Sequence, residues 1–135
     1  MQQFFVTVVV LASVGLVLGA GLTPEQKEKL SGHHKACLAE TGVDSDLVTK
    51  ARKGEFSEDP KLKEHIFCVA KKIGFVNDAG DFQKDVMKTK ISAVLGDEAL
   101  AEKYIAECAV SKGTPQETAF QAIKCYYEKS RKSVV

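Results

Sequence analysis

Four cysteines, at positions 37, 68, 108 and 125, constrain the fold of this 135-residue chain more than any other feature. An even number of cysteines in a small exported protein is typical of a disulfide framework, whereas the same thiols in a cytosolic enzyme would indicate metal or redox chemistry. Four cysteines allow three pairings, and the sequence alone does not choose between them. Whether the cysteines are structural therefore depends on whether the chain is exported.

The N-terminus has the pattern of a secretory leader. An apolar run from Phe4 to Leu18 is followed by small residues up to Gly21. The run is shorter than the roughly 20 residues of a comfortable membrane span, and small side chains suit a signal peptidase. We therefore predict a signal peptide over residues 1–20 and a mature domain over residues 21–135. An uncleaved N-terminal anchor is the alternative.

The charged side chains argue against two classes of partner. There are 19 basic and 18 acidic residues, interspersed along the chain, and the formal net charge is +1. Nucleic acid recognition needs a basic stripe, and a membrane-surface helix carries its charge on one side. We therefore expect no nucleic acid partner and no stable membrane association, and the length of the mature region predicts a single domain.

Helix start and stop signals divide the mature region into about six helices. Thr23, Asp59 and Thr114 each precede a proline, which is the pattern of an N-cap followed by proline at the first helical position. Gln26 and Glu117 are placed to complete capping boxes at two of these starts. Apolar residues recur at helical spacing and no strand pattern is present, so the sequence predicts an all-α fold. The expected helices run over residues 23–42, 44–54, 59–74, 82–95, 97–113 and from 114 onward.

Several spaced features of the mature region give the chain a family resemblance. They are Leu22-Thr23-Pro24-Glu25-Gln26, the Cys37 segment, the Gly74-Phe75-Val76 turn with Gly80, Cys108-Ala109, and Thr114-Pro115 through Cys125-Tyr126-Tyr127. With these features the chain resembles the insect odorant-binding proteins, in their four-cysteine (minus-C) branch. Six-cysteine members of that family have two further cysteines that bond to each other. Here Glu64 stands at the first of those positions and Gln116 or Glu117 at the second.

The resemblance implies a particular architecture and function. It implies six helices enclosing an apolar ligand cavity, with bridges Cys37–Cys68 and Cys108–Cys125. It also implies a secreted, extracellular carrier of odorants, pheromones or related lipids, in sensillar lymph or haemolymph, with no cofactor and no metal. The expected partners are a small hydrophobic molecule and an odorant receptor, and the expected state is a monomer or weak dimer. The alternative is a disulfide-stapled helical interaction or inhibitor protein with a solid core and no ligand cavity.

The candidates for lining the cavity are apolar residues on the helix faces, one turn residue and two tyrosines. The sequence does not separate residues that line a cavity from residues that fill a core, so we expect about half of them to face ligand. Met87 is favoured because an unbranched thioether adapts to differently shaped ligands. The candidates are Leu30, Ile66, Val69, Ile73, Phe75, Met87, Ile91, Val94, Leu95, Leu100, Tyr104, Ile105, Phe120, Ile123 and Tyr127.

The histidines do not indicate an active site. His65 and Cys68 have the spacing of a helical His-x-x-Cys found in secreted phospholipases A2, but the paired cysteines and the glycine-rich calcium loop of that class are missing. His33 and His34 are adjacent, hence about 100° apart on a helix, and cannot bind one metal together. We expect no catalysis, and we expect any pH effect on affinity to arise from these three histidines.

The tail, residues 130–135, contains two cationic residues that would be costly to bury, so we do not expect it to compete for the cavity.

Overall fold

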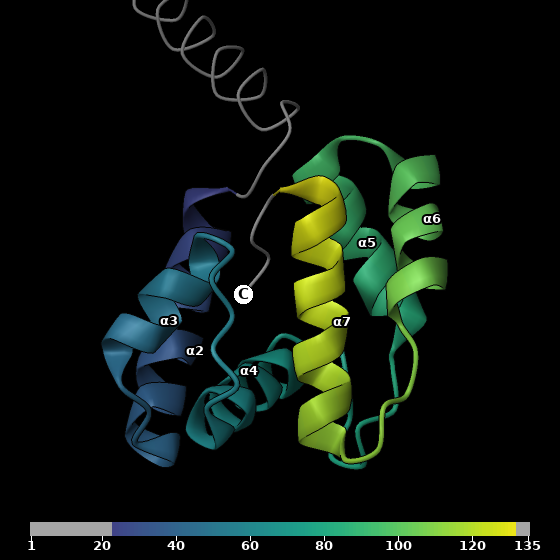
Figure 1. Cartoon of the computed structure of the whole chain (residues 1–135). Helices are drawn as coiled ribbons and strands as arrows, with labels where there is room; N and C mark the ends of the chain where they lie inside the picture. Colours follow the sequence, from purple (N-terminus) through teal and green to yellow (C-terminus); the bar gives the residue numbers. More distant parts are fainter. Residues whose placement is uncertain (1–22, 132–135) are drawn as a thin grey trace, which may run out of the picture.

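Residues 23–131 form an all-α domain in the computed structural model (Figure 1). This confirms the predicted fold class. The predicted signal peptide, residues 1–20, and the end of the tail, residues 132–135, lie outside the described residues. Within residues 23–131, no helix is both long enough and apolar enough to cross a membrane. The helices are α2 (Pro24–Thr41), α3 (Ser45–Arg52), α4 (Pro60–Lys72), α5 (Lys84–Leu95), α6 (Glu98–Cys108) and α7 (Pro115–Ser130).

The helices pack in a short series of contacts. Helix α2 packs on α4, α4 on α7, α7 on α6, and α6 on α5. Figure 1 shows α2 and α3 on one side of the molecule and α5 and α6 on the other, with α7 between the two sides. The fully buried centre includes Leu62 and Val69 of α4 and Phe120 of α7. The core therefore lies where α4 and α7 meet.

Local capping explains where the helices begin. The Thr23 hydroxyl accepts a hydrogen bond from the Gln26 backbone N–H at 3.1 Å, and the Thr23 N–H donates to the Gln26 side chain at 2.9 Å, so the first predicted capping box is present. At the start of α7 only half of the second box forms. The Thr114 hydroxyl accepts from the Glu117 N–H at 3.1 Å, but the Glu117 carboxylate pairs with Lys63 of α4 at 2.7 Å instead. A tertiary ion pair has replaced a local contact.

Several helix boundaries differ from the sequence-based expectation, and two of the differences have a clear local cause. Helix α5 begins at Lys84, because Phe82 forms an isolated antiparallel bridge with Val76 and so belongs to the preceding turn. Helix α6 ends at Cys108 and does not continue to residue 113, since Ala109 leaves the helical conformation with ψ at 71°. The connection to α7 is then held by the Thr118 hydroxyl, which accepts from a backbone N–H of that loop at 2.8 Å.

Two disulfides join neighbouring helices. Cys37–Cys68 links α2 to α4, and Cys108–Cys125 links α6 to α7. No cysteine is left free. These are the two pairings that the resemblance implies. Each bridge fixes a helix pair that also packs through side chains, so the crosslinks and the core stabilise the same arrangement.

Candidate ligand-binding cleft

A cleft of about 280 Å³ lies between α2, the end of α4 and α5. Its apolar surface comes from Leu30 of α2, from Ile73 and Phe75 at the end of α4, and from Val94 of α5. Phe75 and Val94 are buried, while Leu30 and Ile73 are half-buried. The apolar floor is therefore covered by protein on its inner side and open toward solvent at its mouth. All four residues are among the candidates from the sequence, and their role in binding stays a prediction.

A second and much smaller void adjoins the cleft. Phe75 lines both spaces and so forms part of the wall between them. The volume of the second void is about 20 Å³, which is room for about one water molecule and too little for an organic ligand. Five further candidates line it: Met87, Ile91, Tyr104, Ile105 and Ile123.

The remaining candidates line neither of these two spaces. Ile66, Val69 and Phe120 are buried in the interior. Leu95, Leu100 and Tyr127 are half-buried, and the ring of Tyr127 packs edge-on against Phe56 at 6.0 Å between centroids. Helical periodicity marked all of these residues as inward-facing. It did not indicate which of them face a space and which face other side chains.

The mouth of the cleft is polar and basic, which the apolar pattern did not reveal. Gln26, Lys29 and His33 of α2, Lys72 of α4 and Lys90 of α5 complete its lining. One signal was available, since residues 26, 30 and 33 are spaced four and three apart and so share one face of a helix. That spacing predicts that Gln26 and His33 lie on the same face of α2 as Leu30. It gives no information about the lysines contributed by α4 and α5.

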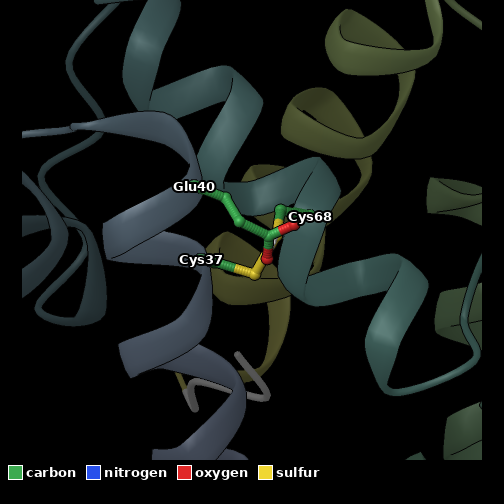
Figure 2. Close-up of side chains that lie close together, drawn as sticks. All are labelled: Cys37, Glu40 and Cys68. Carbon is green, nitrogen blue, oxygen red and sulfur yellow. Dashed lines mark hydrogen bonds between the residues drawn. A yellow bond between two sulfur atoms is a disulfide. The ribbon is translucent and has the colours of Figure 1, made fainter.

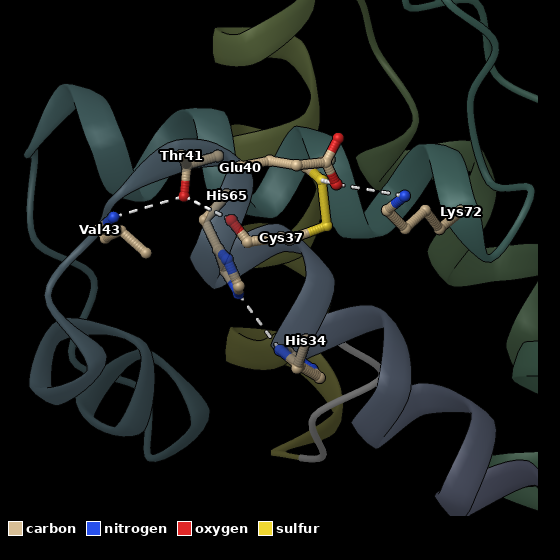
Figure 3. Close-up of a disulfide and its surroundings, with 8 residues drawn as sticks. His34, Cys37, Glu40, Thr41, Val43, His65 and Lys72 are labelled. Atoms are coloured by element: carbon tan, nitrogen blue, oxygen red, sulfur yellow. Dashed lines mark hydrogen bonds and ion pairs between the residues drawn. A yellow bond between two sulfur atoms is a disulfide. The ribbon is translucent and has the colours of Figure 1, made fainter.

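Beside the cleft, two buried histidines contact each other across α2 and α4. His34 Nδ1 lies 3.2 Å from His65 Nε2, and the side chains are only 5% and 1% exposed (Figure 3). His33 faces the cleft while His34 faces the interior, as their 100° separation on a helix requires. Burial lowers the pKa of the His65 imidazole below its ordinary value of 6.5. The backbone carbonyl of Cys37 opposes this shift and the charge of Arg52 adds to it.

We predict that the burial of His65 makes the fold less stable in acid. The unfolded chain takes up a proton at His65 below about pH 6.5, whereas the folded chain resists it, so the unfolding free energy falls as pH drops from 6.5 toward the lowered pKa. One such proton costs about 1.4 kcal/mol per pH unit. Urea titrations between pH 7.5 and 5 should show this slope. It should flatten in His65→Gln and persist in the control His33→Gln, and an equal slope in all three proteins would assign the acid sensitivity to other groups.

Glu40 lies against the Cys37–Cys68 bridge, but the three residues do not form a metal site (Figure 2). The Glu40 carboxylate oxygen is 3.5 Å from Cys68 Sγ. Both sulfurs are bonded to each other, so neither carries a thiol proton to donate nor the thiolate charge that binds a metal. The same carboxylate oxygen instead pairs with Lys72 Nζ at 3.2 Å (Figure 3). Glu40 therefore forms an ion pair with Lys72, one of the lysines at the mouth of the cleft.

Comparison with known proteins places this architecture in a family. The model of the PBP/GOBP family matches residues 19–129. The B1 protein of Tenebrio molitor is 36% identical over 110 residues, which cover 82% of this chain and 85% of that protein. The structure of the THP12 carrier protein from the yellow meal worm is 40% identical, with a TM-score of 0.60, and the match covers 73% of this chain and 91% of that one. The fatty acid binding protein from the oral disk of the blowfly Phormia regina is 28% identical, with a TM-score of 0.67, covering 84% and 97%.

The sequence matches, the helical fold and the disulfides agree with one another. The family and the neighbouring structures are binding and carrier proteins and not enzymes. Two bridges among four cysteines fit the minus-C pattern. The chain belongs to the PBP/GOBP family, in the four-cysteine branch of the insect odorant-binding proteins.

Proposed function

We propose that this protein is a secreted carrier that holds one small hydrophobic molecule in the cleft between α2, α4 and α5. The observation that carries the proposal is the cleft itself, with an apolar floor on Phe75, Val94, Leu30 and Ile73 and a volume of about 280 Å³. Ligand sites in proteins are concave, mostly apolar and of about 300 Å³ upward. A disulfide-stapled interaction protein does not need an apolar space of this size, so the cleft favours carriage over that alternative.

Apolar burial is sufficient for carriage without any chemistry on the ligand. Removing about ten CH₂ groups from water yields some 8 kcal/mol, which corresponds to a micromolar complex before the costs of association. The family supports the same function, since one related structure is a carrier protein and another is a fatty acid binding protein. The leader-like N-terminus and the two disulfides support export.

A naphthylamine fluorophore tests carriage directly. Delipidated, oxidised protein should bind it with a dissociation constant of about 1–10 μM. Leu30→Trp should fill the cleft and weaken binding by about tenfold or more, a loss of about 1.4 kcal/mol. Ala39→Trp, at an exposed position of the same helix, is the matched control and should bind normally. Because the chain has no tryptophan, either indole also reports folding. Uptake that is absent in the wild type, or equal in both variants, would contradict the proposal.

A further inference from the structure

The charged side chains at the mouth of the cleft are all basic, although basic and acidic residues are nearly balanced over the whole chain. The chain has 19 basic and 18 acidic side chains. Three lysines, Lys29, Lys72 and Lys90, line the cleft together with His33, and no carboxylate does. They come from three different helices. Folding therefore brings these side chains together, and they are not part of one basic segment of the sequence. A purely apolar ligand would make no use of this arrangement.

Existing ion pairs do not neutralise the three ammonium groups equally. Lys29 contacts Glu25 at 3.7 Å, but both side chains are highly exposed, so water screens the pair. Lys72 pairs with Glu40 at 3.2 Å, and Glu40 does not itself line the cleft. Lys90 has no ion pair with any carboxylate of residues 23–131. The exposed ammonium of Lys90 is thus the cation at this mouth most available to a ligand.

We propose that the cleft selects single-chain amphiphiles with a carboxylate head over neutral molecules of the same chain length. The inference rests on the proposed function and specifies its ligand class. The alkyl chain would lie on the floor made by Leu30 and Phe75, and the head would lie at the mouth near Lys90, with Lys29 and Lys72 adding to the positive potential. A neutral alcohol would bury the same chain but gain nothing from the ammonium groups.

The size of the preference follows from the exposure of the lysines. A single charge pair at about 4 Å contributes a factor of about five in water and far more where the solvent is partly excluded. The lysine heads are solvated at the mouth, so we expect a carboxylate to bind about tenfold more tightly than the matched alcohol. The same screening predicts that salt weakens only the carboxylate.

Competition against the bound naphthylamine tests the preference, with decanoate and 1-decanol as a pair of equal chain length. In about 50 mM salt decanoate should displace the fluorophore about tenfold more effectively, and in about 500 mM salt the difference should shrink to about threefold or less. Lys90→Gln should weaken decanoate by about threefold to tenfold and leave decanol unchanged, and Lys90→Arg should restore decanoate. Lys84→Gln, which removes an exposed lysine of α5 that does not line the cleft, is the matched control and should have no effect.

The outcomes separate this inference from the proposal on which it rests. If the fluorophore binds and decanoate and decanol displace it equally, the carboxylate preference is overturned while carriage stands. The same conclusion holds if Lys84→Gln weakens decanoate as much as Lys90→Gln does, because the effect would then come from general charge. If the wild-type protein binds no fluorophore at all, the proposed function itself fails.

Discussion

Removal of the Cys37–Cys68 bridge by paired alanine substitution should cost about 4 kcal/mol of unfolding free energy. The bridge closes a loop with a sequence separation of 31, and in the chain-entropy model a loop of this length restricts the unfolded chain by about that amount. The net stability of a small domain is only about 5–15 kcal/mol, so a large part of it would be lost. Urea denaturation without added oxidant or reductant measures the change in unfolding free energy. The midpoint of thermal unfolding should fall by about 15 °C.

The second bridge provides a matched comparison. Cys108–Cys125 has a separation of 17, so its removal should cost less, about 3 kcal/mol. The two losses should also differ in function. Helices α2 and α4 both line the cleft, whereas α7 contributes nothing to its lining. Loss of the first bridge should therefore weaken fluorophore binding in protein that is still folded, and loss of the second should leave it nearly unchanged. A smaller stability loss for the first pair than for the second would contradict the loop-length argument.

The other large effect should come from Phe120→Ala, at about 3–5 kcal/mol. Phe120 is fully buried in α7, its ring meets the Phe56 ring edge-on at 5.9 Å, and the Lys63 ammonium lies 5.1 Å from the ring centre. Truncation removes these contacts and leaves a cavity at the junction of α4 and α7. Denaturant titration of the oxidised protein measures the loss.

The same substitution separates a core residue from one that lines a ligand cavity. Phe120→Leu keeps most of the apolar volume, so it should cost less than half as much as Phe120→Ala. If Phe120→Ala costs less than about 1.5 kcal/mol, the ring does not fill a packed core. Phe120 would then line a cavity, as the sequence-based list of candidates had it. Fluorophore affinity, measured in parallel, should be unchanged in Phe120→Leu because the residue does not line the cleft.

The lysines at the cleft mouth also show why ligand class is harder to infer than fold. Lys29, Lys72 and Lys90 do not stand out in a chain where basic and acidic residues are interspersed. Their shared feature is position in space, since each comes from a different helix and all lie on one opening. Charge composition argued against nucleic acid as a partner, but it held no information about a local excess of basic residues formed by folding.

The sequence by itself determined where most of the helices begin, and it limited the four cysteines to three possible pairings. Thr23, Asp59 and Thr114 cap helices as expected, because a cap depends on hydrogen bonds to backbone groups two or three residues away. Tertiary structure alone decided the rest. It ended α6 at Cys108, turned Glu117 from its own helix toward Lys63, and paired His34 with His65 across 31 positions. It also decided which apolar residues face the cleft, since Leu30 and Phe120 have the same helical signal and differ only in whether a neighbouring helix fills the space in front of them.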